Sequence, residues 1–386
     1  MAETIVVAGS LAQKPRQGGH TWVFLQYLLG FRRLGWDVIF LDRLEREMCV
    51  DNAGQPCPLE ESLNLRYFLD CMERFGLQGA YSLIYHGGER FIGLSREGLL
   101  ERISRSALLL NVMGFLQDPE LLAYASRRVF LDIDPGFGQM WQALGLHNIF
   151  QGHDQYVTIG RNIGRTDCAI PDCDLDWITT PQPIVLDYWP VRSACGSGKF
   201  TSICSWRGPY GPLEYQGKTY GLRVHEFRKF APLPRLSERP FELALDIHPA
   251  DDKDQVLLAA NGWTVVDPKK VASDPGSYQA YVQGSKAEFM VAKGMYVQTN
   301  SGWFSDRSIC YLASGKPVLA QDTGLQPHYP VGEGLLVFRT LDEALAGIEE
   351  LERNYARHAG AARALAEEYF DSDRVLNRLL GKLGVG

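Results

Sequence analysis

The chain has 386 residues, a length that predicts two globular domains. Hydrophobic residues make up 45% and charged residues 22% of the sequence, the composition of a globular protein, which excludes disordered, collagen-like and coiled-coil chains. The formal net charge of −7 disfavours binding of nucleic acids or anionic membranes over the bulk of the surface, although a local basic patch can override this balance.

The sequence also bears on the compartment. No run of 18 apolar residues is present and the start of the chain carries no basic leader, so we expect no membrane span. The eight cysteines include no CxxC pair, and the closest two, Cys168 and Cys173, have a spacing that only weakly indicates zinc. We therefore expect reduced thiols, several of them buried, in a cytoplasmic protein.

In the first half, β-branched runs alternate with amphipathic segments. Residues 4–9 predict a buried parallel strand, residues 20–34 an amphipathic helix that ends at Gly35, and residues 37–42 a second strand. Later runs that repeat the strand pattern are residues 107–112, 128–133 and 155–159. The first half is therefore expected to form an open α/β sheet with helices on both faces.

The amino-acid composition changes around residues 177–200, where Pro, Gly and Ser are frequent, as in an interdomain linker. Strand and helix patterns then alternate again, with strands predicted at 200–204, 241–246, 263–267, 288–292, 317–321 and 335–338. Residues 340–380 predict two or three helices. We expect domains at 1–192 and 193–386 that form a clamshell, with ligands at the carboxyl ends of the strands, facing the cleft.

The first candidate site joins the first strand to the first helix. Gly18 and Gly19 allow a tight turn and close approach of a ligand, and His20 follows at the start of the helix. The positive end of the helix dipole favours the neutral imidazole, which can accept a proton from an acceptor hydroxyl. His20 is thus a candidate general base with Gly19 beside the acceptor. The alternative is a histidine that caps the helix or is satisfied in the core.

Two carboxylates follow another predicted strand. Asp132 and Asp134 lie at its carboxyl end, where one of them can orient the imidazole of His20. They also spell Asp-x-Asp, which binds a divalent metal in some sugar-transfer enzymes, but chance alone yields such pairs in this composition. We favour the orienting role and predict no metal site.

Residues 301–324 are rich in groups that bind anions. A loop with Gly and Ser opens a short helix near Ser305, and the helix ends at Ser314 and Gly315 before the next strand. Hydroxyls, free backbone N–H groups and Arg307 at one helix N-terminus suit a diphosphate, the alternative being ordinary capping with a surface ion pair of the arginine. The candidate donor-binding residues here are Ser301, Gly302, Ser305, Asp306, Arg307, Ser308, Asp322 and Thr323.

Three further positions face the same cleft in this scheme. Ser205 and Arg207 follow the first strand of the second half, where Arg207 can meet a phosphate and Trp206 can stack on a base, unless this segment is a plain turn. Asn162 is a candidate on the acceptor side.

These residues carry a resemblance to a known family. Ala313-Ser-Gly-Lys-Pro-Val318 resembles the turn that follows the donor-site helix in nucleotide-sugar-dependent glycosyltransferases of the GT-B fold. The placement of Gly19 and His20 resembles that of the catalytic histidine in inverting members, which an Asp of the same domain orients. The resemblance implies two Rossmann-like, doubly wound domains facing a central cleft, with closing helices at the C-terminus.

One departure from the family pattern bears on mechanism. Aligned through the Ala313–Val318 turn, the Glu that usually holds the donor's ribose falls at Cys310, and the earlier Glu of the retaining relatives falls at Gly302. Neither residue is a carboxylate. Asp306 is the candidate for the missing acid, and the resemblance favours the inverting subgroup.

The sequence thus predicts an acceptor-binding N-terminal domain and a donor-binding C-terminal domain. The expected reaction moves a sugar from a nucleotide diphosphate sugar to a hydroxyl of a small molecule or glycan, with inversion and without a metal or other cofactor. A nucleic-acid acceptor is disfavoured by the acidic balance. The alternatives are a nucleotide-sugar epimerase or hydrolase on the same architecture, and a non-catalytic nucleotide-sugar-binding protein.

Overall fold

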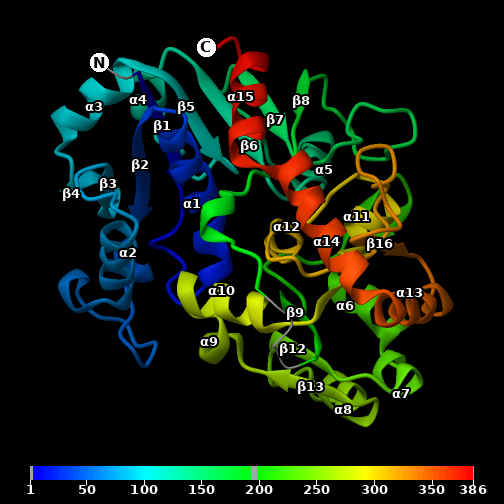
Figure 1. Cartoon of the computed structure of the whole chain (residues 1–386). Helices are drawn as coiled ribbons and strands as arrows, with labels where there is room; N and C mark the ends of the chain where they lie inside the picture. The colour runs from blue at the N-terminus through cyan, green and yellow to red at the C-terminus, as the bar shows by residue number, and fades with distance from the viewer. Residues whose placement is uncertain (1–2, 193–197, 386) are drawn as a thin grey trace.

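Two largely parallel β-sheets, one in each half of the chain, form the frame of the computed structural model (Figure 1). The structure describes residues 3–192 and 198–385. Residues 193–197 of the predicted linker lie outside the described residues, and the predicted domain boundary at 192/193 falls at their edge. The chain leaves the first sheet after Thr179 and enters the second sheet at Phe200.

The first sheet has eight strands in the order β4-β3-β2-β1-β5-β6-β7-β8, all parallel except β4, which runs antiparallel to β3. Its central strand β1 is fully buried, because its continuous β-branched run packs on both faces. The strands are β1 (Thr4–Gly9), β2 (Asp37–Leu44), β3 (Tyr81–Tyr85), β4 (Arg90–Gly93), β5 (Ser106–Val112), β6 (Arg128–Asp132), β7 (Gln155–Thr158) and β8 (Trp177–Thr179). Its helices are α1 (Gly18–Arg33), α2 (Leu63–Arg74), α3 (Arg96–Ser104), α4 (Pro119–Tyr124) and α5 (Phe137–Ala143).

The second sheet has six parallel strands in the order β13-β12-β9-β14-β15-β16, so the third, second, first, fourth, fifth and sixth strands of this half lie in a row, as in a Rossmann fold. The strands are β9 (Phe200–Ser205), β12 (Phe241–Asp246), β13 (Trp263–Val266), β14 (Ala287–Met290), β15 (Val318–Gln321) and β16 (Leu335–Phe338). A separate hairpin pairs β10 (Leu213–Tyr215) with β11 (Lys218–Tyr220).

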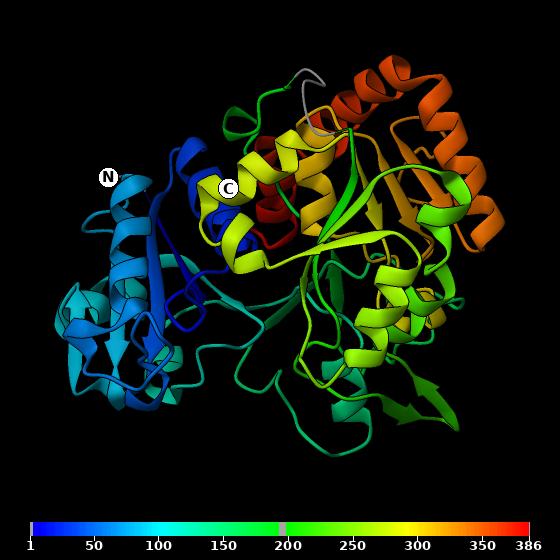
Figure 2. The ribbon, with the colours of Figure 1, turned by 90° about the horizontal axis from the view of Figure 1, so that it is seen from below.

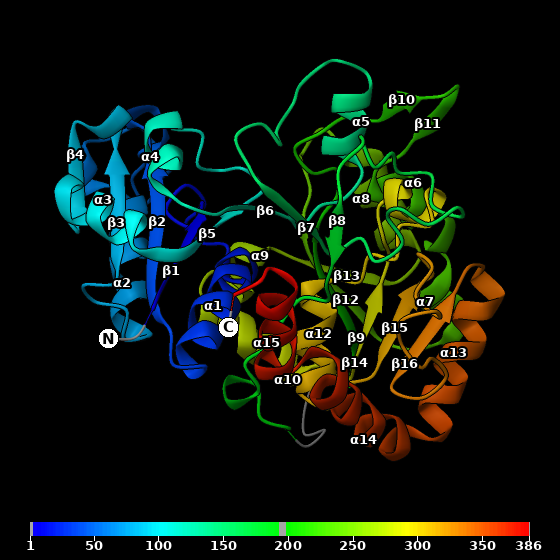
Figure 3. The same ribbon diagram turned by 90° about the horizontal axis from the view of Figure 1, so that it is seen from above.

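Helices of the second half cover this sheet and reach back to the first half. They are α6 (Arg223–Phe227), α7 (Leu233–Ser237), α8 (Asp252–Ala260), α9 (Pro268–Val271), α10 (Pro275–Gly284), α11 (Gly294–Gln298), α12 (Asp306–Ala313), α13 (Leu341–Arg353), α14 (Tyr355–Leu365) and α15 (Ser372–Lys382). Both α10 and α15 contact α1, and Figures 2 and 3 show them between the two halves. The last helix of the chain therefore packs on the first.

The strands and helices that periodicity predicts are present. The predicted strand 4–9 is β1, the helix at 20–34 is α1, and the short helix near Ser305 is α12, followed by Gly315 in the left-handed region (φ +70°). The helical tail consists of α13, α14 and α15. Within the described residues no helix is long and apolar enough to cross a membrane, and their seven cysteines are free thiols.

Candidate active site

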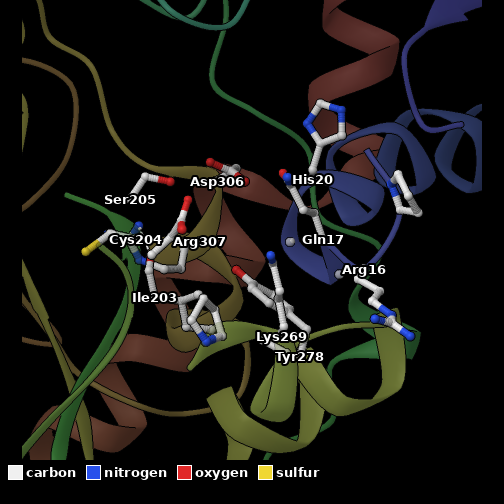
Figure 4. Close-up of a pocket in the computed structure, with 16 residues that line it drawn as sticks. Arg16, Gln17, His20, Ile203, Cys204, Ser205, Lys269, Tyr278, Asp306 and Arg307 are labelled. Atoms are coloured by element: carbon white, nitrogen blue, oxygen red, sulfur yellow. Dashed lines mark hydrogen bonds between the residues drawn. The ribbon is translucent and has the colours of Figure 1, made fainter. Parts of the chain in front are cut away.

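Two adjoining cavities lie between the halves, at the carboxyl ends of β9, β12 and β13. The first, about 250 Å³, is lined by residues 15–20 of the first half and by residues of the second half that include Ser205, Asp306 and Arg307. Figure 4 shows His20 on one side of this cavity and these three residues on the other. The second cavity, about 950 Å³, shares Gln17, Ser205, Asp246, Pro268 and Lys269 with the first.

The glycines before His20 allow the two halves to touch. A Cβ on Gly18 would lie 2.3 Å from the carbonyl oxygen of Asp274, and a Cβ on Gly19 would lie 2.8 Å from the ring of Tyr278. The Gly18 N–H donates to the carbonyl oxygen of Ala272 at 3.0 Å. The N-terminus of α1 is thus seated directly on the second half, which fixes His20 at the wall of the cavity.

The hydrogen bonds of His20 define its tautomer. Nε2 lies 3.2 Å from the carbonyl oxygen of Ser10 and 3.2 Å from its hydroxyl. Because a carbonyl oxygen only accepts, Nε2 carries the proton and Nδ1 carries the lone pair. Burial and the nearby Lys14 ammonium lower the pKa of His20 to about 3. The imidazole is therefore neutral at physiological pH, as predicted, although burial rather than the helix dipole is the main cause.

The loop before α1 is held by the end of β2. The buried carboxylate of Asp42 accepts from the Ala12 N–H at 2.7 Å, and the side-chain amide of Asn64 donates to the Ala12 carbonyl oxygen at 2.9 Å. Arg16 has a left-handed backbone (φ 61°), and its guanidinium bonds to Asn52. Since Arg16 lines the first cavity, these contacts set the shape of its wall.

Arg307 lines the cavity but is not a free cation. It is buried and forms an ion pair with Glu288, which is 0% exposed, while Nη1 donates to the carbonyl oxygen of Ile203 at 2.8 Å. Burial alone would lower the pKa of Arg307, but Glu288 raises it, so the guanidinium stays charged. Among the described residues Nη2 has no hydrogen-bond partner. The Nη2 atom is itself buried, so this ion pair, whose charges cancel, presents no accessible Nη2 donor to the cavity in this structure.

The start of α12 is built as the sequence predicts. Ser305 caps the helix by accepting from the Arg307 N–H at 3.3 Å, and Asp306 in the first turn lines the first cavity. Burial raises the pKa of Asp306, and Arg307 opposes this shift. Ser308 is fully buried, so its hydroxyl lies within the protein and not on the cavity wall.

The two aspartates do not orient His20 in this structure. Asp132 accepts from Gln139 at 2.7 Å and Thr158 at 2.8 Å, and burial raises the pKa of Asp132 to about 6. The carboxylate of Asp134 pairs with Lys293 at 2.6 Å and also bonds to Tyr296, across the interface between the halves. Strand β5 lies between β1 and β6, which separates both carboxylates from His20. The backbone and hydroxyl of Ser10 take the expected place of the aspartate.

Other predicted residues form structure outside the cavities. Asn162 is fully buried and bridges the halves: its Nδ2 donates to the carbonyl oxygens of Asn300 and Gly324, and its Oδ1 accepts from His328 at 2.6 Å. It is therefore an interdomain tie and not part of an acceptor surface. The predicted donor-binding residues that are buried and line neither cavity are Ser301, Gly302, Ser305, Ser308, Asp322 and Thr323.

The loop after β9 contributes both structure and cavity wall. Trp206 lines the second cavity but is only 1% exposed, and its indole N–H donates to Asp254 at 2.8 Å, so little of its ring is available to stack on a base. Ser205 lines both cavities and Arg207 lines the second. Arg207 forms a bidentate pair with Asp251, in which Nη2 donates to Oδ1 at 2.5 Å and Nε to Oδ2 at 3.1 Å; the arginine is half-exposed and the carboxylate largely buried.

Several residues that line the cavities are not among the predicted site residues. Lys14 and Lys269 bring positive charge to the cavities, Asp246 brings a carboxylate and Tyr278 an aromatic wall. Asp246 was open to prediction, because it ends a strand that the sequence predicts and the carboxyl ends of parallel strands face the cleft. Lys14 and Tyr278 carry no such signal, since only the packing of the halves places them at the cavity.

The comparisons with known proteins concern the architecture. No protein-family model and no curated protein sequence matches the chain. An alpha-glucosyltransferase solved with UDP is similar with a TM-score of 0.63 and 10% identity, over 99% of this chain and 100% of that one. Sucrose-phosphate synthase from Thermosynechococcus elongatus gives 0.55 and 12%, over 99% of each chain. Anabaena HepE with UDP and glucose gives 0.56 and 12%, also over 99% of each chain. The chain has the GT-B fold.

The structure shows the surroundings of the two positions, Cys310 and Gly302, where the GT-B family pattern would place a Glu. Cys310 is buried inside α12, where its Sγ lies 3.3 Å from the carbonyl oxygen of Asp306. A Cβ at Gly302 would lie 2.9 Å from Asn162, so no larger side chain fits there. Both positions that the resemblance assigns to a Glu are thus closed by the packing of this chain.

Proposed function

We propose that this protein is a glycosyltransferase that moves a sugar from a nucleoside diphosphate sugar to a hydroxyl acceptor. The observation that carries the proposal is the first cavity of the GT-B fold, which His20, with its neutral imidazole, lines on one side and Asp306 and Arg307 at the start of α12 line on the other. The UDP complexes among the similar structures make UDP-sugars the first donors to test.

The second half supplies the donor site in this proposal. The N-terminus of α12 and the exposed Lys269 ammonium favour a diphosphate in the first cavity, which Arg307 also lines. These groups stabilise the leaving diphosphate without a metal. In the described part of the chain, no cluster of three or more His, Cys, Asp or Glu side chains is arranged to bind a metal ion.

The first half supplies the base. The Nδ1 lone pair of His20 takes the proton of the acceptor hydroxyl, while the hydroxyl oxygen bonds to the anomeric carbon and the bond from that carbon to the diphosphate breaks. Attack from the face opposite the leaving group inverts the anomeric centre. A pKa near 3 makes a weak base, but a bound diphosphate raises it, because a nearby negative charge favours the imidazolium.

The test is donor turnover with a set of UDP-sugars and a panel of sugar and phenolic acceptors, read by phosphorus NMR. We expect His20→Ala to lower kcat by about 10²–10⁴-fold with nucleotide binding retained, because it removes a general base and not the donor site. His147→Ala, at an exposed histidine outside both cavities, is the matched control and should leave the rate unchanged. EDTA should not lower the rate.

The other outcomes separate the rival functions. If the wild type consumes the donor without transfer to any acceptor, the protein is a hydrolase or epimerase. If the wild type binds nucleotides but turns over no donor, it is a binding protein. Full activity of His20→Ala, or product with the donor's anomeric configuration, contradicts the histidine-base mechanism. One similar alpha-glucosyltransferase was solved with UDP and DNA, so an oligonucleotide acceptor belongs in the panel, although we favour a small molecule or glycan.

A further inference from the structure

The carboxylate of Asp246 stands out among the acids of the second cavity. Three carboxylates line this cavity: Asp246, Asp251 and Asp267. Asp251 pairs with Arg207, and Asp267 caps α9 by accepting from the Lys269 N–H at 2.9 Å. The Asp246 side chain is exposed, and no hydrogen bond or ion pair to it occurs among residues 3–192 and 198–385. It is therefore the acid that is available to a ligand.

The position of Asp246 in the sheet indicates which part of a ligand it can bind. Asp246 is the last residue of β12, the second strand of a Rossmann-like sheet, and it pairs in register with Ser205 at the end of the first strand β9. In Rossmann folds, an acidic residue after the second strand accepts hydrogen bonds from the hydroxyls of a nucleotide ribose. Asp246 also lines both cavities, so it stands where they meet.

The surroundings of Asp246 match the rest of a nucleotide. On one side, the second cavity has an apolar wall of Pro249, Val265 and Val266, with Val265 39% exposed, which suits the face of a base. On the other side, Lys269 lines both cavities, and Arg307 lies in the first, where a diphosphate would meet them. Base, ribose and diphosphate thus follow one another along the two cavities.

We propose that Asp246 binds the ribose of the donor nucleotide by accepting hydrogen bonds from its 2′- and 3′-hydroxyls. The base then lies in the second cavity, and the diphosphate points into the first. This inference rests on the proposed function, since it assumes a nucleoside diphosphate. It moves the ribose contact from α12, where Cys310 is buried, to the end of β12. Asp306, in the first cavity alone, is left to face the donor's sugar or diphosphate end.

Calorimetry with ribo- and 2′-deoxyribonucleotides tests the proposal. The full chain is titrated with UDP, ADP, GDP and CDP, and the tightest ligand is compared with its 2′-deoxy form. A hydrogen bond to a charged acceptor predicts that the wild type prefers the ribonucleotide by about 10- to 100-fold. Asp246→Ala and Asp246→Asn should lose most of this preference. Asp252→Ala, at an exposed acid in α8 that lines neither cavity, should keep it.

Each contrary result has a separate meaning. Equal binding of ribo- and deoxyribonucleotide by the wild type, or a preference that survives in both Asp246 variants, overturns the ribose assignment while nucleotide binding still supports the proposed function. Loss of the preference in Asp306→Asn with retention in Asp246→Ala assigns the ribose to Asp306 and also overturns it. Binding of none of the four nucleotides contradicts both proposals.

Discussion

At the scale of single residues, the cavity is lined by groups whose charge state depends on what surrounds them. His20 is neutral because its ring is buried beside Lys14, and Arg307 is charged because Glu288 is buried beside it. The sequence predicts both residues at the cavity, since each lies in the first turn of a predicted helix. Their partners could not be predicted, because Ser10, Lys14 and Glu288 are brought to them by tertiary packing alone.

The titration of His20 can be measured directly. In the protein without added nucleotide, nitrogen-15 NMR of the imidazole should show the neutral form, protonated at Nε2, down to about pH 4, since the pKa is about 3. The unfolded chain takes up this proton near pH 6.5. Folding stability from this residue is therefore fully present above pH 6.5 and is lost as pH falls toward 3. A midpoint near 6.5 in the folded protein would show that the ring is not desolvated as described.

The ion pairs of Arg307 and Arg207 allow a comparison of a buried pair with a more exposed one. Arg307→Ala leaves the fully buried Glu288 without its partner, so we expect a loss of about 3–5 kcal/mol in the free energy of unfolding. Arg207→Ala removes a pair whose arginine is 46% exposed, so solvent screens it and we expect a smaller loss, about 1 kcal/mol. Urea denaturation measures both.

A second variant keeps the Arg307 prediction testable if Arg307→Ala does not fold. Replacement of both partners, Arg307→Met with Glu288→Met, removes both buried charges and should recover most of the lost stability. A small effect of Arg307→Ala, equal to that of Arg207→Ala, would contradict the buried ion pair.

At the scale of elements, periodicity predicts the buried strands and the long helices. The run at residues 4–9 is continuous and apolar, and it forms the central strand β1. The elements that were missed have weaker patterns: β4 (Arg90–Gly93) is a short, largely exposed edge strand, and the hairpin of β10 and β11 stands apart from both sheets. Such elements are set by what they pack against, and their own sequence does not reveal them.

The start of α1 allows a test of the contact between the halves. Gly18→Ala places a methyl group 2.3 Å from the Asp274 carbonyl oxygen, so we expect a loss of about 1–3 kcal/mol in the free energy of unfolding. In Gly360→Ala, within α14, the methyl group meets nothing within 4 Å, and the better helix propensity of Ala should stabilise by about 0.5–1 kcal/mol. Urea denaturation compares the two. Equal effects of the two substitutions would contradict the close contact of α1 with the second half.

At the scale of the whole molecule, the halves are joined around the cavities by contacts that are distant in sequence. Asp134 pairs with Lys293, Asn162 bonds to His328, and α15 returns from the end of the chain to pack on α1. The sequence predicts the two sheets and the cleft between them. It cannot predict that Asn162 serves this joint, because a buried amide that ties two halves has the same local pattern as one that faces a ligand.

In the proposed function, a nucleoside diphosphate lies between the halves, with His20 on one side and the ends of β9 and β12 on the other. The most direct measurement is difference density in crystals of the chain grown with UDP. We expect a nucleotide whose diphosphate lies at the start of α12 beside Arg307 and Lys269, and whose ribose contacts Asp246. A nucleotide bound elsewhere on the chain, with both cavities filled by solvent alone, would contradict this expectation.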